Sequence, residues 1–123
     1  MYIENEKKVV VGLCEGRHPL PVEGYIFGEN VNPLDFDGMS KTVREFLNSR
    51  VGISVHPRTG MNQHDMYTDV SCYVGDAELI VYVTGLTACT AAVISECAYN
   101  GVPLTLMHFN RDTGDYIPQK VIW

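Results

Sequence analysis

Residues 77–109 decide the fold, and they read AELIVYVTGLTACTAAVISECAYNGVPLTLMHF. The first part, Glu78 to Val83, is rich in β-branched residues and favours a short strand. It stops at residues 84–87, Thr-Gly-Leu-Thr, where a glycine and hydroxyls suit a turn and a helix cap. From Leu86 to Asn100, apolar residues recur in steps of three and four, which indicates a helix, and Gly101 suits its C-terminal cap. Residues 104–109 then predict a second strand.

Two strands joined through a helix should be parallel neighbours, connected by a right-handed crossover. In open α/β sheets, ligands bind outside the carboxyl ends of such strands, where helix N-termini offer N–H groups to anions. Residues 84–87 follow the first of these strands, and Asn110 and Arg111 follow the second. We therefore expect Thr84 and Asn110 to share one rim that takes a small phosphorylated ligand.

The remaining chain completes a small α/β fold. Residues 9–14 are apolar without alternation, which is typical of a strand near the sheet centre that is covered on both faces. Further expected elements are strands at 25–27, 51–55 and 66–73, a helix at 39–50, and an antiparallel edge strand at 116–121, which contains Pro118. The prediction is a Rossmann-like mixed sheet with two main helices, a parallel βαβ unit at 78–109 and an antiparallel edge strand after it.

The composition limits the partners. The chain has 123 residues, enough for one domain (1–123), with 46% hydrophobic and 20% charged residues. Its 9 basic and 15 acidic residues give a net charge of -6, which argues against binding a nucleic-acid polymer or an anionic membrane. We see no signal peptide and no run of roughly 20 apolar residues, so we expect a cytoplasmic protein.

Two loops add candidate ligand residues. The loop after residue 14 carries Arg17 and His18 towards the predicted rim, and the polar loop at 56–65 carries Arg58. Arginine matches the geometry of phosphate, and aromatic residues could stack on a base. The aromatic candidates are Tyr25, Phe27, Tyr67, Phe109 and Tyr116. The predicted ligand-binding residues are Arg17, His18, Arg58, Thr84, Gly85, Leu86, Thr87, Phe109, Asn110 and Arg111.

No catalytic pattern emerges. Cys89 could be a nucleophile with His108 as its base, but it lies on the apolar stripe of its helix, which favours core packing. The four cysteines are expected to be core residues, and the four histidines lack metal-ligand spacing. No spacing singles out a pair of carboxylates, and residues 84–87 lack a complete phosphate-loop or dinucleotide motif. We predict no catalytic residue, metal or cofactor.

The second helix is apolar or small nearly all round. Besides the stripe that should face the sheet, it carries Ala88, Ala91, Ala92, Ser95 and Ala98. A helix of this kind is generally buried on more than one side. In a domain this small, we interpret the pattern as the interface of a homodimer or a larger homo-oligomer.

Three segments carry a family resemblance. They are residues 81–87 (VYVTGLT) with the alanine-rich helix behind them, residues 104–116 (LTLMHFNRDTGDY), and residues 14–21 (CEGRHPLP). Together with the overall length, they resemble the anti-Thoeris sponge family of phages, Thoeris anti-defence protein 1. The likeness covers most of the chain and contains no catalytic signature.

The resemblance implies a non-catalytic phage sponge that acts in the cytoplasm of the infected bacterial host. Such a protein binds and sequesters cyclic ADP-ribose isomers (gcADPR type) made by TIR-domain enzymes of Thoeris immunity. The resemblance also implies ligand pockets between subunits of a homo-oligomer such as a hexamer, and a second site for cyclic di- or trinucleotides. One alternative is a CRISPR-type cyclic oligoadenylate sensor or ring nuclease, because its strand-turn-helix unit is similar. The other is an oligomeric interaction module without a nucleotide ligand.

Overall fold

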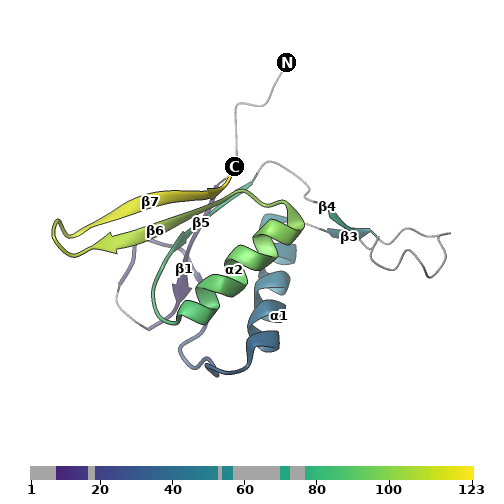
Figure 1. Ribbon diagram of the computed structural model, residues 1–123, viewed down its shortest axis with the longest axis horizontal. Helices are drawn as coiled ribbons and strands as arrows, with labels where there is room; N and C mark the ends of the chain where they lie inside the picture. The colour runs from purple at the N-terminus through teal and green to yellow at the C-terminus, as the bar shows by residue number, and fades with distance from the viewer. Residues whose placement is uncertain (1–7, 17–18, 53, 57–69, 73–76) are drawn as a thin grey trace, which may run out of the picture.

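The computed structural model describes residues 8–16, 19–52, 54–56, 70–72 and 77–123 (Figure 1). The elements are β1 (Lys8–Cys14), β2 (Tyr25–Phe27), α1 (Phe36–Phe46), the π-helical turn η1 (Leu47–Val51), β3 (Ser54–His56), β4 (Val70–Cys72), β5 (Glu78–Tyr82), α2 (Thr87–Asn100), β6 (Leu104–Asn110) and β7 (Asp115–Ile122). Within these residues, no helix has the length and apolarity needed to cross a bilayer.

A five-stranded mixed sheet forms the centre of the fold, in the order β2-β1-β5-β6-β7. The first four strands of that order are parallel, and β7 runs antiparallel to β6 at one edge. The predicted α/β class, the parallel βαβ unit and the antiparallel edge strand are confirmed. Strands β3 and β4 pair with each other in a separate antiparallel ribbon.

Both helices cover the same face of the sheet. The crossover through α1 leads from β2 past β1 to β5, and the crossover through α2 leads from β5 to β6, so both move in one direction along the sheet. Right-handed crossovers that move in one direction place their helices on one side. Accordingly, α1 and α2 lie against each other beside the strands (Figure 1).

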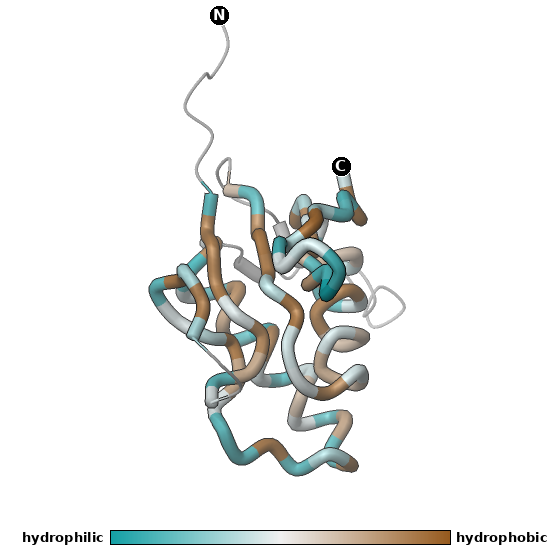
Figure 2. Tube along the Cα trace, turned by 90° about the vertical axis from the view of Figure 1, so that its left-hand side faces the viewer, coloured by the Kyte–Doolittle hydropathy of each residue, from teal (hydrophilic) through white to brown (hydrophobic). Residues whose placement is uncertain are grey.

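The hydrophobic core lies between this face and the two helices. Alternate residues of the inner strands are buried there, as the period of a strand requires. They are Val9, Val11 and Leu13 of β1, Leu79 and Val81 of β5, and Leu104 and Leu106 of β6. They pack with helix residues that include Met39, Val43, Leu47, Cys89, Val93 and Cys97. Figure 2 shows the hydrophobic colour concentrated along these strands and the neighbouring helix.

No helix of the described residues lies on the opposite face of the sheet. On β1 it is covered near Gly12, where an added Cβ would lie 2.5 Å from the Tyr25 ring and 3.0 Å from Leu20. Elsewhere, this face is partly exposed at Val10, Ile80 and Tyr82. Residues 9–14 were expected to be covered on both faces. The helices cover one face, and Leu20 of the loop and Tyr25 cover the other face near Gly12.

The first helix differs from its prediction at both ends. It starts at Phe36, three residues before the predicted start, because Asp35 caps it: its carboxylate accepts the Gly38 N–H at 3.0 Å. It passes at Leu47 into the π turn, which ends at Gly52 with a left-handed φ of 90°. Val51 therefore belongs to this turn. Of the predicted strand 51–55, residues 54 and 55 belong to β3, and residue 53 lies outside the described residues. Of the predicted strand 66–73, residues 70–72 form β4 and the rest lie outside the described residues.

Candidate functional site

The carboxyl ends of β5 and β6 meet at one edge of the sheet, as predicted. Tyr82 pairs with Met107, and the Val83 N–H donates to the Met107 carbonyl at 3.0 Å. However, β6 continues beyond this level to Asn110, paired only with β7. At about 3.3 Å per residue, Asn110 lies roughly 10 Å past Met107. Arg111 is exposed in the turn of this projecting hairpin (Figure 1).

Thr84 is turned towards β1 rather than β6. Its side chain is buried, and its hydroxyl accepts the Cys14 N–H at 3.3 Å and donates to the Cys14 carbonyl at 3.1 Å. It therefore ties the ends of β1 and β5 together. The predicted hydroxyl cap of the second helix is wrong, because the N-cap of α2 is Leu86 and no side chain caps it.

The start of α2 offers backbone donors to the rim. The N–H groups of Cys89 and Thr90 reach the Leu86 carbonyl at 3.1 and 3.3 Å, whereas the first helical N–H groups have no carbonyl within the helix to reach. Gly85 and Thr87 are exposed at this point, and Leu86 packs partly on the core. Gly85 has a φ of 86°, a left-handed conformation that favours glycine. The rim thus presents amides at the positive end of a helix dipole.

An aromatic cluster lies at the same end of the sheet as these amides, on the face that the helices leave uncovered. Tyr82 and Tyr116 meet edge to face with ring centroids 4.8 Å apart, and Phe109 lies 5.3 Å from Tyr116. Phe109 is 50% exposed. Burial raises the pKa of the Tyr116 phenol, and the nearby Tyr82 and Tyr25 add to this shift. The cluster combines a stacking surface with the Tyr116 phenol, which remains protonated at neutral pH.

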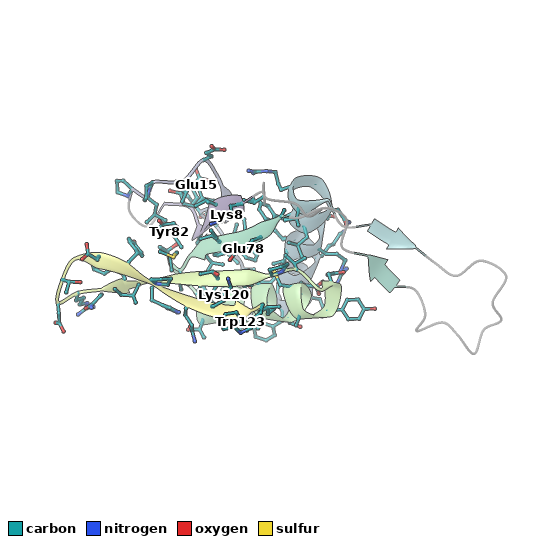
Figure 3. The ribbon with its side chains drawn as sticks, turned by 90° about the horizontal axis from the view of Figure 1, so that it is seen from above. Lys8, Glu15, Glu78, Tyr82, Lys120 and Trp123 are labelled. Atoms are coloured by element: carbon teal, nitrogen blue, oxygen red, sulfur yellow. The ribbon has the colours of Figure 1, made fainter. Side chains whose placement is uncertain are left out.

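The two ends of the uncovered face differ in chemistry. Figure 3 shows Tyr82 towards the hairpin, and Glu78 and Lys120 towards the other end. There, Glu78 accepts the Thr105 hydroxyl at 2.7 Å and faces Lys120 at 4.0 Å. The aromatic end therefore suits a base, and the other end is already occupied by its own polar contacts.

The structure brings together some predicted site residues and separates others. Gly85, Leu86 and Thr87 lie at the start of α2, Phe109 belongs to the aromatic cluster, and Asn110 and Arg111 lie at the far end of the hairpin. The Asn110 side-chain oxygen accepts the Asp112 N–H at 2.9 Å and so shapes that turn. Arg17, His18 and Arg58 lie outside the described residues, as does Tyr67. Phe27 is a core residue with 4% exposure.

Sequence reasoning missed Tyr82. Its strand reads as a continuous apolar run, so nothing marked one side of the strand as exposed. The available signal was the period of two: Leu79 and Val81 face the core, which places Tyr82 on the opposite face.

Three cavities among the described residues are not lined by residues 84–87 or 109–111, although one of them reaches Ala88 in the first turn of α2. One of about 440 Å³ lies between the end of β2 and α1, and its lining includes Asn30, Asp35 and Lys41. Another of about 390 Å³ lies between α1 and α2. A third of about 370 Å³ lies at the ends of β1 and β2, where Glu15 and Glu29 make it unfavourable for anions.

Three of the four cysteines that were predicted to be core residues are confirmed as such. Cys14, Cys89 and Cys97 are fully buried. Burial, helped by the adjacent Glu96 carboxylate, raises the pKa of Cys97 from 9.0 to about 12. The His108 ring nitrogen lies 2.6 Å from the Gln119 side-chain oxygen, across the β6–β7 pair. In the described part of the chain, no three His, Cys, Asp or Glu side chains are grouped to hold a metal ion.

No protein-family model, curated protein or solved structure matches this chain.

Proposed function

We propose that this protein binds and sequesters a cyclic ADP-ribose signal without cleaving it, and so inhibits Thoeris-type immunity in an infected bacterium. The observation that carries the proposal is that the uncapped start of α2 and the cluster of Tyr82, Phe109 and Tyr116 lie at the same end of the sheet, the carboxyl end of β5 and β6. The resemblance of residues 81–87 and 104–116 to the anti-Thoeris sponges supports the same ligand class.

The chemistry of this edge suits a nucleotide that has both rings and phosphates. Amides at a helix start bind phosphate oxygens, and an aromatic surface binds the face of a base. Arg111 adds a charge whose planar fork matches phosphate. Because it lies at the hairpin tip, it would act on a ligand that extends along the hairpin or one held by a neighbouring subunit.

The burial of the Cys89 thiol favours sequestration over catalysis. Cys89 lies in the first turn of α2, where a reactive thiolate would be expected, but its side chain is fully buried among core residues. A buried thiol is inert. The edge is thus arranged for recognition.

The direct test is release of the captured ligand. The protein is mixed with a cyclic ADP-ribose isomer and separated from free ligand, then denatured by heat, and the released nucleotide is identified by chromatography. The proposal expects intact nucleotide. A cleaved product would support a ring nuclease or another enzyme instead, and no depletion of nucleotide would support an interaction module.

A variant localises the site. We expect Arg111→Ala to weaken nucleotide binding by about 1.5–3 kcal/mol, the range for a hydrogen bond to a charged group. Lys41→Ala is the matched control, because it removes one exposed positive charge on α1, away from the aromatic cluster. Equal affinities of the two variants in titration calorimetry would remove Arg111 from the site.

A further inference from the structure

A separate hollow of about 260 Å³ lies at the opposite pole of the sheet, at the amino end of β1. Its lining combines apolar and charged residues from three segments: Lys8, Val9 and Val10 of β1, Pro21, Val22 and Glu23 of the loop before β2, and Arg50 of the π turn. It shares no residue with the nucleotide rim.

The loop side of the hollow is held in place by backbone contacts. The Val22 N–H donates to the Leu20 carbonyl at 2.8 Å, and the Gly12 N–H donates to the Gly24 carbonyl at 2.9 Å. Pro21 fixes its own φ. The wall formed by Pro21 and Val22 is therefore preorganised.

The π turn positions Arg50. Such turns are rare and occur frequently at functional sites. The guanidinium carbon lies 5.6 Å from the centre of the Phe46 ring, within the range of a cation–π contact. A Cβ added to Gly24 would lie 3.7 Å from Arg50 Nη1, so the guanidinium also lies close to the loop backbone. Arg50 is thus held at the hollow by its own helix and by the loop.

The charges of the hollow are available to a ligand. Ion pairs seen among the described residues join Arg44 to Glu96 and Lys120 to Glu78, and neither uses Lys8, Arg50 or Glu23. Two cations and one carboxylate leave a net charge of +1 here, in a chain with a net charge of -6. A monoanion balances this charge, whereas a phosphate dianion exceeds it and is repelled by Glu23.

We propose that this hollow binds a small monocarboxylate with a compact apolar body. Arg50 and Lys8 hold the carboxylate, since guanidinium pairs with carboxylate through two parallel hydrogen bonds. Val9, Val10, Pro21 and Val22 surround the apolar body, whose removal from water supplies the rest of the affinity. The site lies outside the nucleotide rim and does not depend on the function proposed above.

The test is a titration of isotope-labelled protein followed by amide NMR shifts, with isovalerate as the probe. Isovalerate should cause saturable shifts at Val9, Val22 and Arg50. Inorganic phosphate lacks the apolar body and isoamyl alcohol lacks the charge, so each should bind at least about tenfold more weakly. Saturation that is equally strong with phosphate, or no saturable shift with isovalerate, would overturn the proposal.

Variants assign the roles of the charges. Arg50→Gln and Lys8→Gln should each weaken isovalerate binding about tenfold, which is the loss of one charge-assisted contact. Glu23→Gln should tighten binding, and Lys41→Gln on α1 should leave it unchanged. Arg50 lies in the π turn, so the amide spectrum of Arg50→Gln is compared with that of the wild type to check that the turn is intact. Lys8 lies in β1, so Lys8→Gln tests the site without altering that turn. Unchanged affinity in Lys8→Gln, with the fold intact, would refute the site.

A last arm separates the two proposals. Isovalerate affinity is measured again with a saturating cyclic ADP-ribose isomer present. Because the hollow and the rim lie at opposite ends of the sheet, isovalerate should bind with the same affinity in the presence and absence of the nucleotide. This expectation holds whether or not the nucleotide binds at the rim. Direct competition would mean that the hollow belongs to the nucleotide site, and would overturn a separate carboxylate site.

Discussion

Thr84 shows how one hydroxyl can join two strands that are 70 residues apart in sequence. Its two hydrogen bonds to Cys14 link the carboxyl ends of β1 and β5. After β1 the chain continues to β2 on one side of this pair, and after β5 it continues to β6 on the other side. In many α/β folds, a crevice opens between strands at such a place and holds the ligand. Here Thr84 bridges the two strand ends. The backbone N–H groups that a ligand can reach are therefore those at the start of α2.

We expect Thr84→Val to destabilise the protein by about 1–3 kcal/mol, because valine has the same shape but leaves two buried backbone groups of Cys14 without their partner. Thr87→Val is the matched control: it makes the same change at an exposed position and should stay within about 0.5 kcal/mol of wild type. Urea denaturation measures both. Equal losses in the two variants would mean that the hydrogen bonds to Cys14 contribute nothing measurable.

Cys97 should make the protein less stable in alkali. Its thiol keeps its proton up to about pH 12 in the folded chain, whereas in the unfolded chain it loses the proton near pH 9. Between these values the unfolded state binds fewer protons, so the free energy of unfolding falls as pH rises. Below pH 9 this group contributes no pH dependence.

Denaturation at pH 8 to 11 tests this effect. Above pH 9, the free energy of unfolding should fall more steeply for wild type than for Cys97→Ala, by up to about 1.4 kcal/mol per pH unit. The comparison uses slopes, because the substitution also removes buried volume at every pH. Parallel curves for the two proteins would show that the Cys97 thiol titrates alike in both states.

At the scale of the elements, helix ends depend on backbone conformation as much as on side chains. α2 ends at Gly101 with a φ of 71°, and its N–H donates to the Ala98 and Cys97 carbonyls. We expect Gly101→Ala to cost about 1 kcal/mol, the penalty for a side chain in the left-handed region. No atom lies within 4 Å of the added Cβ, so crowding contributes nothing.

Gly28→Ala controls for the loss of glycine alone. An added Cβ there also meets no atom within 4 Å, and Gly28 has no positive φ. Its stability should therefore match or slightly exceed that of wild type, since alanine lowers the entropy of the unfolded chain. If thermal denaturation shows both alanine variants equally destabilised, the left-handed conformation is not the cause.

The sequence was informative where a local pattern decides an element. The β-branched run at 78–83, the apolar steps of α2 and Gly101 predicted their elements almost to the residue. The start of α1 was missed because its signal is the Asp35 carboxylate, which lies before the first residue of the apolar periodicity. The length of the projecting hairpin was missed for another reason. β6 extends beyond the end of β5 because it pairs with β7 there, and the sequence of one strand alone does not show this pairing.

For the candidate site, the sequence placed residues at the correct edge but not their orientations. That β5 and β6 are parallel neighbours follows from the helix between them, so a shared edge could be predicted. Whether Thr84 points to β1 or to β6 depends on its contact with Cys14, which is distant in sequence. The aromatic cluster likewise arises from three strands and becomes visible only when they are assembled.

At the scale of the whole molecule, placing both helices on one face leaves α2 with an outer surface of small residues. Ala91, Ser95 and Ala98 are exposed there, and Ala91 and Ser95 line the apolar hollow between α1 and α2. At the start of α1, Leu34 and Phe36 are 76% and 57% exposed. Large apolar side chains beside a hollow of small residues make a surface suited to a second copy of the chain, in line with the homo-oligomer that we expect from the sequence.

We expect the wild-type chain to form a homo-oligomer and Ala91→Arg to be a monomer, because an arginine in the middle of the small-residue surface prevents the close approach of two helices and introduces an unpaired charge. Asn48→Arg is the matched control, since it adds the same charge at an exposed position of the π turn and changes the net charge equally. Light scattering after gel filtration gives the mass of each variant. A wild-type mass of about one chain would refute self-association, and an unchanged oligomer in Ala91→Arg would move the interface to another surface, such as the uncovered face of the sheet.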